Sequence, residues 1–458
     1  MFKISLKSYP TIKPEYELVK WNKKNEVLFL ISYPTKKEVG EKWEVNEAAF
    51  DVLSLINGKR SLSKIIELLQ EKYSQPRNEI VDKVIALIRD LVSIGMVNIQ
   101  NQAKESKREV IEINSDYWLK VLGMEITKRC NLKCKHCYVR GNEEEMPIEK
   151  IKNIIDQGKK IGVESVTLTG GEPFLREDVF EILNYIDSKN MRVRILSNGT
   201  LIDRETAKRL QSLKNVFLSI SLDGPKDVHE KLRRVKGCFD KTLNGIKNLI
   251  EFGLRPRISF TLSKYALGRS KEVLKIVKEL GYSKPPDLGF VLNLGRAKEY
   301  EICVTPEEYA KELKEYWKAA KQIFNLKEFI IAKSNKGCCW VGKEPLIVTS
   351  EGNIIPCTML NQDPFILGNI YYDTLEDVWN HSPILKRIRN IDLRRNKKCK
   401  KCNHLAYCVG GCRVSAMVST NNIEGFFRSH DPYACAFFDA LGDDIKVVEK
   451  ADSELFLK

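Results

Sequence analysis

Three cysteines within eight residues are the densest set of reactive side chains in this sequence. Cys130, Cys134 and Cys137 are separated by three and then by two residues. Thiolates are soft ligands that select iron–sulfur clusters or zinc over hard cations. A structural zinc site needs a fourth Cys or His at short range, and the nearby candidate, His136, lies between the second and third cysteines. The spacing favours a 4Fe-4S cube held at three irons, with the fourth iron open, and zinc is the alternative.

A glycine-containing run, Thr167–Pro173, is the second group of residues with a chemical use. Its sequence is Thr-Leu-Thr-Gly-Gly-Glu-Pro. Gly170 and Gly171 carry no Cβ atom, so their backbone can approach a ligand closely and present carbonyl oxygens to it. Such a turn suits the ammonium group of an amino-acid-like ligand, and a generic tight turn is the alternative.

Together the cysteine loop and the glycine run resemble the radical S-adenosylmethionine superfamily, whose signature is a Cys-x3-Cys-x-aromatic-Cys loop. The resemblance implies a 4Fe-4S cluster that binds S-adenosylmethionine, cleaves it after receiving an electron, and yields a 5′-deoxyadenosyl radical that abstracts a substrate hydrogen. The cofactor supplies that step, and the protein orients it and excludes side reactions. His136 fills the aromatic position, which in such enzymes lies against the adenine.

Further contacts to S-adenosylmethionine are implied by the same resemblance. Arg233 matches an arginine that in relatives pairs with the methionine carboxylate, a bidentate task suited to guanidinium. Two neighbours depart from the family pattern, since Arg234 stands where relatives often carry glycine and Cys238 where they often carry serine. The implied contact residues are His136, Gly170, Gly171, Glu172, Pro173, Asn198, Ser221, Asp223 and Arg233.

Length and composition indicate a large globular protein. The chain has 458 residues, of which 43% are hydrophobic and 30% charged, and this length predicts about three domains. It has no apolar run long enough to span a membrane, and its start lacks the apolar stretch of a signal peptide, so we expect a cytoplasmic protein without a membrane partner. In such a protein its 13 cysteines indicate metal or redox chemistry instead of disulfides.

The formal net charge of +15 includes one dense basic run, Lys386–Lys401. A solvated helix face is one interpretation of this run. The other is that it offsets the charge of thiolate-bound clusters and attracts an acidic electron donor or peptide. Because charge in residues 1 to 100 is nearly balanced, the basic stripe expected of a duplex-binding domain is missing, and we expect no nucleic-acid partner.

The first segment, residues 1–105, has the pattern of a small winged-helix domain. Its stretch Trp43–Gly58 resembles the precursor-recognition domains of ribosomal-peptide maturases, which are related to the peptide chaperone of pyrroloquinoline quinone biosynthesis. Such domains bind a leader peptide as an extra edge strand, so the resemblance implies a precursor-peptide partner; DNA binding and plain scaffolding are the alternatives. The expected elements are strands at Val27–Tyr33, Trp43–Val45 and Met96–Gln100 and helices at Asn46–Ile56, Ser63–Tyr73 and Arg77–Ile94.

The second segment, residues 116–325, alternates strands with helix-length amphipathic stretches. This alternation predicts an α/β fold with a parallel sheet closed by right-handed crossovers. Six units fit the partial (β/α)6 barrel of the family, whose chemistry lies after the carboxyl ends of the strands. The predicted strands are Leu122–Thr127, Ser165–Thr169, Arg192–Ser197, Val216–Ser221, Arg257–Leu262 and Leu288–Leu292.

The third segment, residues 330–458, is rich in cysteine and resembles the auxiliary-cluster domain, called SPASM, that such maturases append. In that family the ligands interleave, which implies two auxiliary iron–sulfur clusters of the 4Fe-4S type. The first would use Cys357, Cys412 and either one or both of the adjacent Cys338 and Cys339; if one of these is free, a site is left open for substrate sulfur. The second would use Cys399, Cys402, Cys408 and Cys435. A five-cysteine zinc knuckle is the alternative, and Cys238 and Cys303 are interpreted as buried inert thiols.

These observations predict a radical maturase of a ribosomally made peptide, with thioether formation as its expected outcome and ferredoxin or flavodoxin as its electron donor. Thr358 stands where sulfatase-maturing enzymes usually carry an aspartate, and Cys408 where the pyrroloquinoline quinone maturase carries one, so both are disfavoured. A maturase of a metal, haem or quinone cofactor or of a protein side chain is the alternative. From another class, a non-catalytic peptide-binding or transcriptional protein would hold zinc and cleave no S-adenosylmethionine.

Overall fold

The computed structural model describes residues 4–23, 26–33, 41–106, 110–139, 145–327, 329–332 and 339–448. Two compact units divide the chain. Unit 1 contains Met1–Lys120 together with Gly158–Ser165 and Lys189–Met191, and unit 2 contains the remainder. Cys338 lies outside the described residues.

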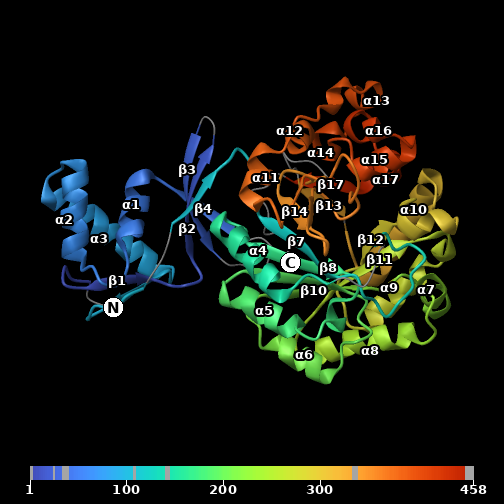
Figure 1. Ribbon diagram of the computed structural model, residues 1–458, viewed down its shortest axis with the longest axis horizontal. Helices are drawn as coiled ribbons and strands as arrows, with labels where there is room; N and C mark the ends of the chain where they lie inside the picture. The colour runs from blue at the N-terminus through green and yellow to red at the C-terminus, as the bar shows by residue number, and fades with distance from the viewer. Residues whose placement is uncertain are drawn as a thin grey trace. The chain divides into compact units, whose positions relative to one another are not determined.

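Unit 1 combines two small sheets with three helices (Figure 1). One sheet has the order β4-β3-β2-β6, and β1 pairs antiparallel with β5. The sequence predicted β3, β4 and β5 but missed the other three strands. The strands are β1 (Tyr9–Ile12), β2 (Glu17–Lys23), β3 (Glu26–Tyr33), β4 (Glu41–Val45), β5 (Val97–Gln100) and β6 (Ile111–Asn114).

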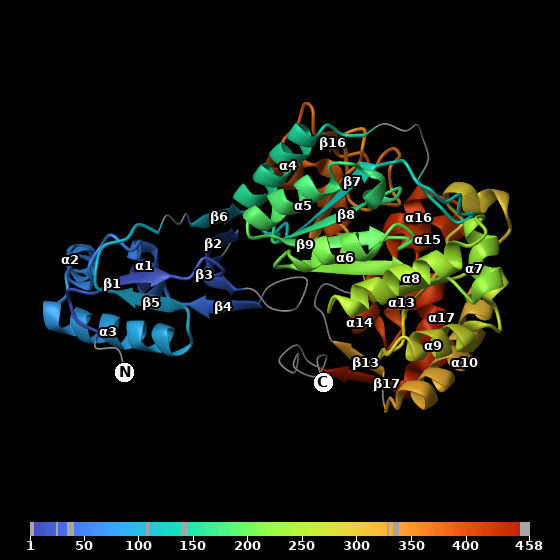
Figure 2. The same cartoon turned by 90° about the horizontal axis from the view of Figure 1, so that it is seen from below.

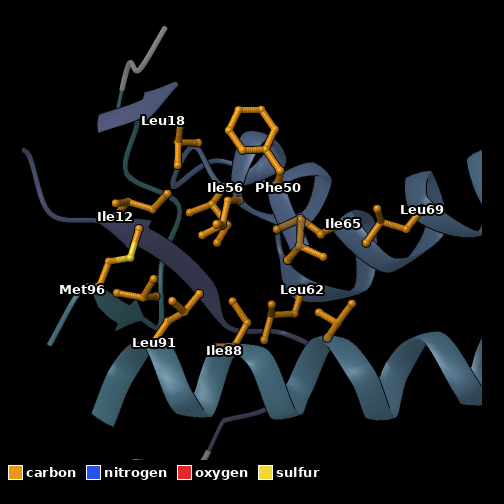
Figure 3. Packing of buried hydrophobic residues seen from close by; sticks show 14 of the residues in the cluster. Ile12, Leu18, Phe50, Ile56, Leu62, Ile65, Leu69, Ile88, Leu91 and Met96 are labelled. Atoms are coloured by element: carbon orange, nitrogen blue, oxygen red, sulfur yellow. The ribbon is translucent and has the colours of Figure 1, made fainter. Parts of the chain in front are cut away.

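The three helices of unit 1 begin and end close to the predicted residues. They are α1 (Glu47–Leu55), α2 (Leu62–Tyr73) and α3 (Arg77–Ser93). Asn46 and Ser61 are N-caps that accept hydrogen bonds from backbone N–H groups three residues on, which satisfies donors left open at a helix start. The apolar faces of the helices pack around a shared core with the β1 and β5 segments, seen in Figure 3 at Ile12, Leu62, Ile65, Ile88 and Met96.

The barrel of unit 2 is built on six strands in sequence order, β7 to β12, as predicted. Figure 1 labels β7, β8 and β10 to β12, and Figure 2 labels β7 to β9. The registered pairs within this group are parallel, and helices connect successive strands, so the α/β fold class is confirmed. The strands are β7 (Val121–Thr127), β8 (Ser165–Gly170), β9 (Arg192–Ser197), β10 (Val216–Ser221), β11 (Arg257–Leu262) and β12 (Asp287–Phe290). The helices are α4 (Ile148–Lys160), α5 (Val179–Ser188), α6 (Arg204–Gln211), α7 (Lys226–Arg233), α8 (Cys238–Glu251), α9 (Ser270–Glu279) and α10 (Pro306–Phe324).

The cysteine-rich tail continues the barrel sheet, which the sequence did not predict. Strand β14 (Pro345–Val348) pairs parallel with β7, and β15 (Asn353–Ile355) and β16 (Gly368–Asn369) extend the sheet as antiparallel neighbours. A separate pair joins β13 (Phe329–Ala332) to β17 (Ile445–Val448). The tail helices are α11 (Leu375–His381), α12 (Pro383–Arg389), α13 (Lys397–Lys400), α14 (Leu405–Cys408), α15 (Arg413–Thr420), α16 (Ile423–Arg428) and α17 (Pro432–Leu441).

Within the described residues, no helix is both long enough and apolar enough to cross a membrane.

Replacing Ile65 with Ala should destabilise unit 1 by about 2–5 kcal/mol, the usual cost of truncating a buried aliphatic side chain. Ile65 is fully buried in the core shown in Figure 3. The measurement is hydrogen exchange of the α2 amides in the full chain. Glu71→Ala, an exposed position of the same helix, is the control and should change stability by less than about 0.5 kcal/mol. Equal protection of α2 in both variants would contradict the packing described.

Candidate active site

The cysteine loop follows β7 and is held by the end of α7. Lys135 N–H donates to the Leu232 carbonyl at 2.9 Å, and Lys133 N–H donates to the Arg233 carbonyl at 3.3 Å. The last carbonyls of a helix have no hydrogen-bond partner within the helix. Here the N–H groups of the loop are their donors. Cys130 is exposed, Cys134 is buried and Cys137 is half-buried. The loop's path is therefore fixed by backbone contacts on both sides of Cys134.

The glycine turn pairs with the chain that enters the cysteine loop. Gly171 N–H donates to the Thr127 carbonyl at 2.7 Å, and Glu172 N–H donates to the Arg129 carbonyl at 2.8 Å. A Cβ on Gly170 would lie 2.1 Å from the Thr127 oxygen, and one on Gly171 would lie 2.0 Å from the Arg129 oxygen. Glycine is therefore required here by the close approach of two backbone segments, in addition to the predicted approach of a ligand.

Glu172 connects the glycine turn to the end of β9. Its carboxylate accepts hydrogen bonds from the Ser197 hydroxyl and from the Asn198 N–H, both at 2.8 Å. Burial raises the pKa of this carboxyl to about 7, although these hydrogen bonds oppose the shift. The next residue, Pro173, is buried and begins a 3-10 turn. Glu172 thus holds two of the predicted loops together through groups of the protein itself.

Asn198 joins a second connection between the β9 loop and the cysteine loop. Its side-chain N–H donates to the Asn131 side-chain oxygen at 2.9 Å, and its own side-chain oxygen accepts from Thr200. Ser221 is half-buried at the end of β10, where it is aligned with Ser259 of β11. The structure therefore places Asn198 beside the loop of Cys130 and Cys134, and places Ser221 at the carboxyl end of its strand.

A buried ion pair joins Asp223 and Arg233. The Arg233 Nη2 and Nε atoms donate to Asp223 Oδ2 at 2.6 and 2.8 Å, and Asp223 Oδ1 accepts from Thr261 N–H at 3.1 Å. Burial opposes the charge of Asp223, but the guanidinium overrides it and the pKa of this carboxyl lies below its usual value. Because Arg233 is also an electrostatic neighbour of Cys130 and Cys134, a positive charge lies beside the cysteine loop.

Arg234 ends α7 in the left-handed conformation, with φ of 60°. Glycine adopts this conformation without steric cost, whereas other residues are strained there. This explains physically why a glycine suits this position. The Arg234 guanidinium donates to the Tyr300 hydroxyl at 2.8 Å, so this chain gains a side-chain contact where it loses the glycine.

His136 has an unpartnered ring nitrogen in the buried interior of the loop. Within the described residues, His136 Nδ1 and Arg296 Nε are both buried without a hydrogen-bond partner. Burial lowers the pKa of His136 to about 4, so the ring is neutral. Arg296 N–H donates to the Cys137 carbonyl at 3.0 Å, and a Cβ on Gly295 would lie 2.5 Å from that oxygen. Two buried polar groups without partners, in side chains that are electrostatic neighbours, suit a heteroaromatic ligand such as adenine.

Burial and neighbouring thiols raise the pKa of Cys130 and of Cys134. Burial is the main cause for Cys134, whose pKa rises to about 11, and the charges of Cys137 and Cys130 add to it, while Arg233 opposes it. Thiolates crowded in this way need a cationic metal centre to become stable. The donor set therefore fits an iron–sulfur cluster, with His136 and the Asp223–Arg233 pair beside it.

A second group of thiols comes from distant parts of the tail. Cys412 has Cys339 and Cys357 as electrostatic neighbours, and burial raises its pKa to about 12. Cys412 N–H donates to Asp431 at 2.9 Å, which fixes the start of α15. Among the residues predicted for the first auxiliary cluster, Cys339, Cys357 and Cys412 are thus brought together, and Cys338 lies outside the described residues.

The third group lines a cavity of about 240 Å³ in the tail. Its thiols are those of Cys399, Cys402, Cys408 and Cys435, and Cys435 has the other three as electrostatic neighbours. Within the described part of the chain, no three His, Cys, Asp or Glu side chains close around a point as tightly as a single metal ion requires. A cavity with four thiols at its wall fits the larger volume of a cluster.

The two remaining cysteines, Cys238 and Cys303, are not assigned to any of the three thiol groups. Cys238 is buried and packs with Leu132 and Cys134, and burial raises its pKa to about 11. Cys303 is half-buried, and burial raises its pKa as well. Both have the features of weakly ionised thiols, which is what an inert structural role requires.

Glu125 is a site residue that the sequence analysis missed. It shares one face of β7 with Gly123 and Thr127, its Cα lies 3.5 Å from where a Cβ of Gly170 would be, and it is 5% exposed. Burial raises its pKa to about 7, against the opposing charge of Lys128. A carboxyl with this pKa can take up or release a proton near neutral pH. The sequence feature that could have identified Glu125 is an acidic residue within an otherwise mostly apolar predicted strand.

Tyr138 and Thr358 form a second missed connection. Tyr138 follows Cys137 directly, and burial raises the pKa of its hydroxyl, which is hydrogen-bonded to Thr358. Cys137, Cys357 and Glu125 are electrostatic neighbours of that hydroxyl. Thr358, where sulfatase-maturing enzymes usually carry an aspartate, therefore lies between the thiol group of the cysteine loop and the thiol group that contains Cys357.

Comparison with known proteins agrees with this architecture. Residues 124–280 match the radical SAM superfamily, residues 338–403 match an iron–sulfur cluster-binding domain called SPASM, and residues 30–97 match coenzyme PQQ synthesis protein D, PqqD. These matches define an iron–sulfur enzyme with a SPASM domain and a PqqD-like domain. The Fe-coproporphyrin III synthase of Methanosarcina barkeri is 37% identical over 65% of this chain and 84% of that protein. The chain belongs to the radical SAM superfamily.

Two further relatives extend over more of the chain. The antilisterial bacteriocin subtilosin biosynthesis protein AlbA of Bacillus subtilis is 27% identical over 82% of this chain and 85% of that protein. The crystal structure of Streptococcus suis SuiB bound to its precursor peptide SuiA has a TM-score of 0.63 at 17% identity, covering 92% of this chain and 99% of that one. The second likeness shows that the fold is shared.

Replacing Glu125 with Gln should make stability less dependent on pH. Folding raises the pKa of Glu125 from 4.5 to about 7, so the folded state holds the proton more tightly and wild-type stability falls as pH rises from about 4.5 to 7. The variant should gain at most about 3 kcal/mol above that range and little below it. Thermal unfolding at several pH values measures this, with exposed Glu279→Gln as the control. A gain that is the same at every pH would contradict burial of the carboxylate.

Arg234→Gly should be more stable than Arg234→Ala by about 1 kcal/mol. Both changes remove the contact with Tyr300, and only glycine adopts the positive φ of this position without strain. The measurement is the difference in unfolding free energy between the two variants by chemical denaturation. If Ala equals Gly, α7 does not end in the conformation described.

Proposed function

We propose that this protein modifies a ribosomally made precursor peptide, with a thioether bond between a cysteine sulfur and a carbon atom as the expected product. The observation that carries the proposal is a PqqD-like unit in the same chain as a radical SAM and SPASM unit. AlbA and SuiB match four fifths or more of this chain. By their printed names, AlbA is a bacteriocin biosynthesis protein and SuiB was solved bound to a precursor peptide.

The open edge strand of unit 1 supports peptide binding. Strand β4 lies at one end of its sheet in the described part of the chain, and Trp43 on β4 is exposed. An extended peptide adds to such an edge through backbone hydrogen bonds, and side-chain pockets give specificity. A tethered leader raises the effective concentration of the peptide core at the barrel.

The residues of the barrel would position S-adenosylmethionine and the substrate. When bound at Cys130, Cys134 and Cys137, the cluster with S-adenosylmethionine supplies a 5′-deoxyadenosyl radical that removes one hydrogen atom from a substrate carbon. His136 would lie against the adenine, and the Asp223–Arg233 pair would receive the methionine carboxylate on the free guanidinium edge. These roles follow the chemistry of each side chain.

The tail cysteines would complete the redox balance. Thioether formation breaks one C–H bond and one S–H bond and forms one C–S bond. The carbon loses a hydrogen atom to the radical, the thiol loses a proton to a base, and one electron must leave the substrate. We propose two auxiliary 4Fe-4S clusters as acceptors of that electron, one at Cys338, Cys339, Cys357 and Cys412 and one at Cys399, Cys402, Cys408 and Cys435. Ferredoxin or flavodoxin would be the external donor of the separate electron that cleaves S-adenosylmethionine.

A second function is favoured by one observation. The Fe-coproporphyrin III synthase is the 37% identical relative, so a radical enzyme acting on an iron tetrapyrrole is the other candidate. It offers no use for the PqqD-like unit. The two candidates differ in substrate and share the radical chemistry, so one assay can separate them.

The test is anaerobic reconstitution followed by incubation with dithionite, S-adenosylmethionine and a cysteine-containing precursor peptide encoded beside the gene. We expect about twelve iron atoms per chain for three cubes, 5′-deoxyadenosine, and loss of two hydrogen atoms from the peptide by mass spectrometry. Trp43→Ala should weaken peptide binding about tenfold, the effect of losing an aromatic contact. Deoxyadenosine formation with an unchanged peptide, together with formation of an iron coproporphyrin when an iron tetrapyrrole precursor replaces the peptide, would support the second candidate. Zinc without deoxyadenosine would reject both.

A further inference from the structure

The basic run of the tail forms one exposed surface around the third thiol group. It spans α12, the turn Leu393–Arg395, α13 and the end of α16, in the orange and red part of Figure 1. We call it the basic surface. Its exposed cations are Lys386, Arg387, Arg394, Arg395, Lys397, Lys398, Lys400, Lys401 and Arg428.

Only part of this charge is neutralised within the protein. Arg387 pairs with Glu424 at 2.7 Å and Arg428 shares the same carboxylate at 3.4 Å, while Arg394 pairs with Asp392 at 2.8 Å. The other cations of the surface have no ion pair among the described residues. Like charges at such density repel one another unless a partner of opposite charge covers them. The cations of the basic surface without an ion pair among the described residues are Lys386, Arg395, Lys397, Lys398, Lys400 and Lys401.

The unneutralised cations directly flank the third thiol group. Cys399 lies within α13 between Lys398 and Lys400, and Cys402 is exposed to solvent. Lys398 and Lys401 also line the cavity that holds the four thiols. A charged partner that covers this surface therefore comes close to the cavity of the four thiols, on the side of the exposed Cys402.

The basic surface contains a groove of about 790 Å³. Arg387, Arg395 and Arg428 line it together with Asp392 and Phe427. Guanidinium groups bind carboxylates in a planar, bidentate manner. Arg395 makes no ion pair within the described residues, so a carboxylate from a partner can occupy it.

We propose that the basic surface docks an acidic one-electron carrier protein, which exchanges its electron with the cluster at Cys399, Cys402, Cys408 and Cys435. The inference rests on the proposed function, because a radical enzyme needs one-electron exchange with an external protein. Redox encounters use small interfaces and depend on charge complementarity. Nucleic acid would also be attracted by the charge, but the proximity of the thiol cavity gives a carrier protein a reason to bind at this place.

The electron step is simple when the carrier is a flavodoxin. The anionic flavin hydroquinone loses one electron and becomes the neutral semiquinone, and the protein gains that electron at its iron–sulfur centre. No bond is made or broken, and no proton moves. Semiquinone formation therefore reports the exchange without any turnover of peptide or S-adenosylmethionine.

The experiment mixes reconstituted protein with a reduced, strongly acidic flavodoxin and follows semiquinone formation by stopped flow, with binding measured separately by fluorescence anisotropy. In the combined variant Arg395→Glu, Lys397→Glu and Lys400→Glu, we expect the second-order rate and the affinity at low salt to fall about tenfold or more. At about 1 M ionic strength, where the screening length is about 3 Å, the wild type and the variant should converge.

The matched control reverses three exposed lysines of the barrel helices, Lys208, Lys241 and Lys247, and should change the rate less than twofold. Iron content and circular dichroism check that each protein is folded and loaded. Equal rates and affinities for the surface variant and the control would overturn the proposal, as would duplex DNA or RNA that binds the surface more tightly and displaces the flavodoxin. Dithionite-driven loss of two hydrogen atoms from the precursor peptide, measured with the wild type, tests the proposed function separately.

Discussion

Backbone hydrogen bonds that hold the cysteine loop are the constraint on which the rest of the site depends. On one side, carbonyls of Thr127 and Arg129 accept N–H groups of the glycine turn, and on the other, the last carbonyls of α7 accept N–H groups of the loop. These contacts come from the fold itself and set the path of the loop. Ordering a ligand loop in advance lowers the entropy cost of binding, which offsets part of the repulsion among crowded thiolates.

The Asp223–Arg233 pair has a related structural role. A buried ion pair contributes little to stability by itself, because desolvation cancels most of the attraction. Its value here is positional, since Asp223 is fixed by a backbone N–H of β11 and Arg233 is thereby held beside Cys134. A free guanidinium would be drawn toward solvent, and a free carboxylate would repel the thiolates.

Local sequence patterns predicted the parts of the structure that depend on local forces. The six barrel strands follow from the alternation of apolar runs and amphipathic stretches, and the helices of unit 1 follow from their helical periodicity. The caps Asn46 and Ser61 were found in the structure. Long-range contacts were not predictable in the same way. Strand β14 joins β7 across more than two hundred residues, and Tyr138 is hydrogen-bonded to Thr358, which is equally distant in sequence. The environment of Glu125, and hence its pKa, likewise depends on neighbours distant in sequence.

The interleaving of the tail thiols has a backbone cause that spacing alone does not reveal. Cys408 and Cys412 are four residues apart, a distance at which two residues of one helix would share a face. Between them the chain takes three consecutive left-handed residues, Val409, Gly410 and Gly411, and a Cβ on Gly410 would overlap the Leu393 side chain. This reversal separates the two thiols, so that Cys408 faces the cavity of the third group while Cys412 joins Cys357. Arg413, buried and an electrostatic neighbour of both Cys399 and Cys412, then places one positive charge between two groups of thiolates, which reduces their mutual repulsion.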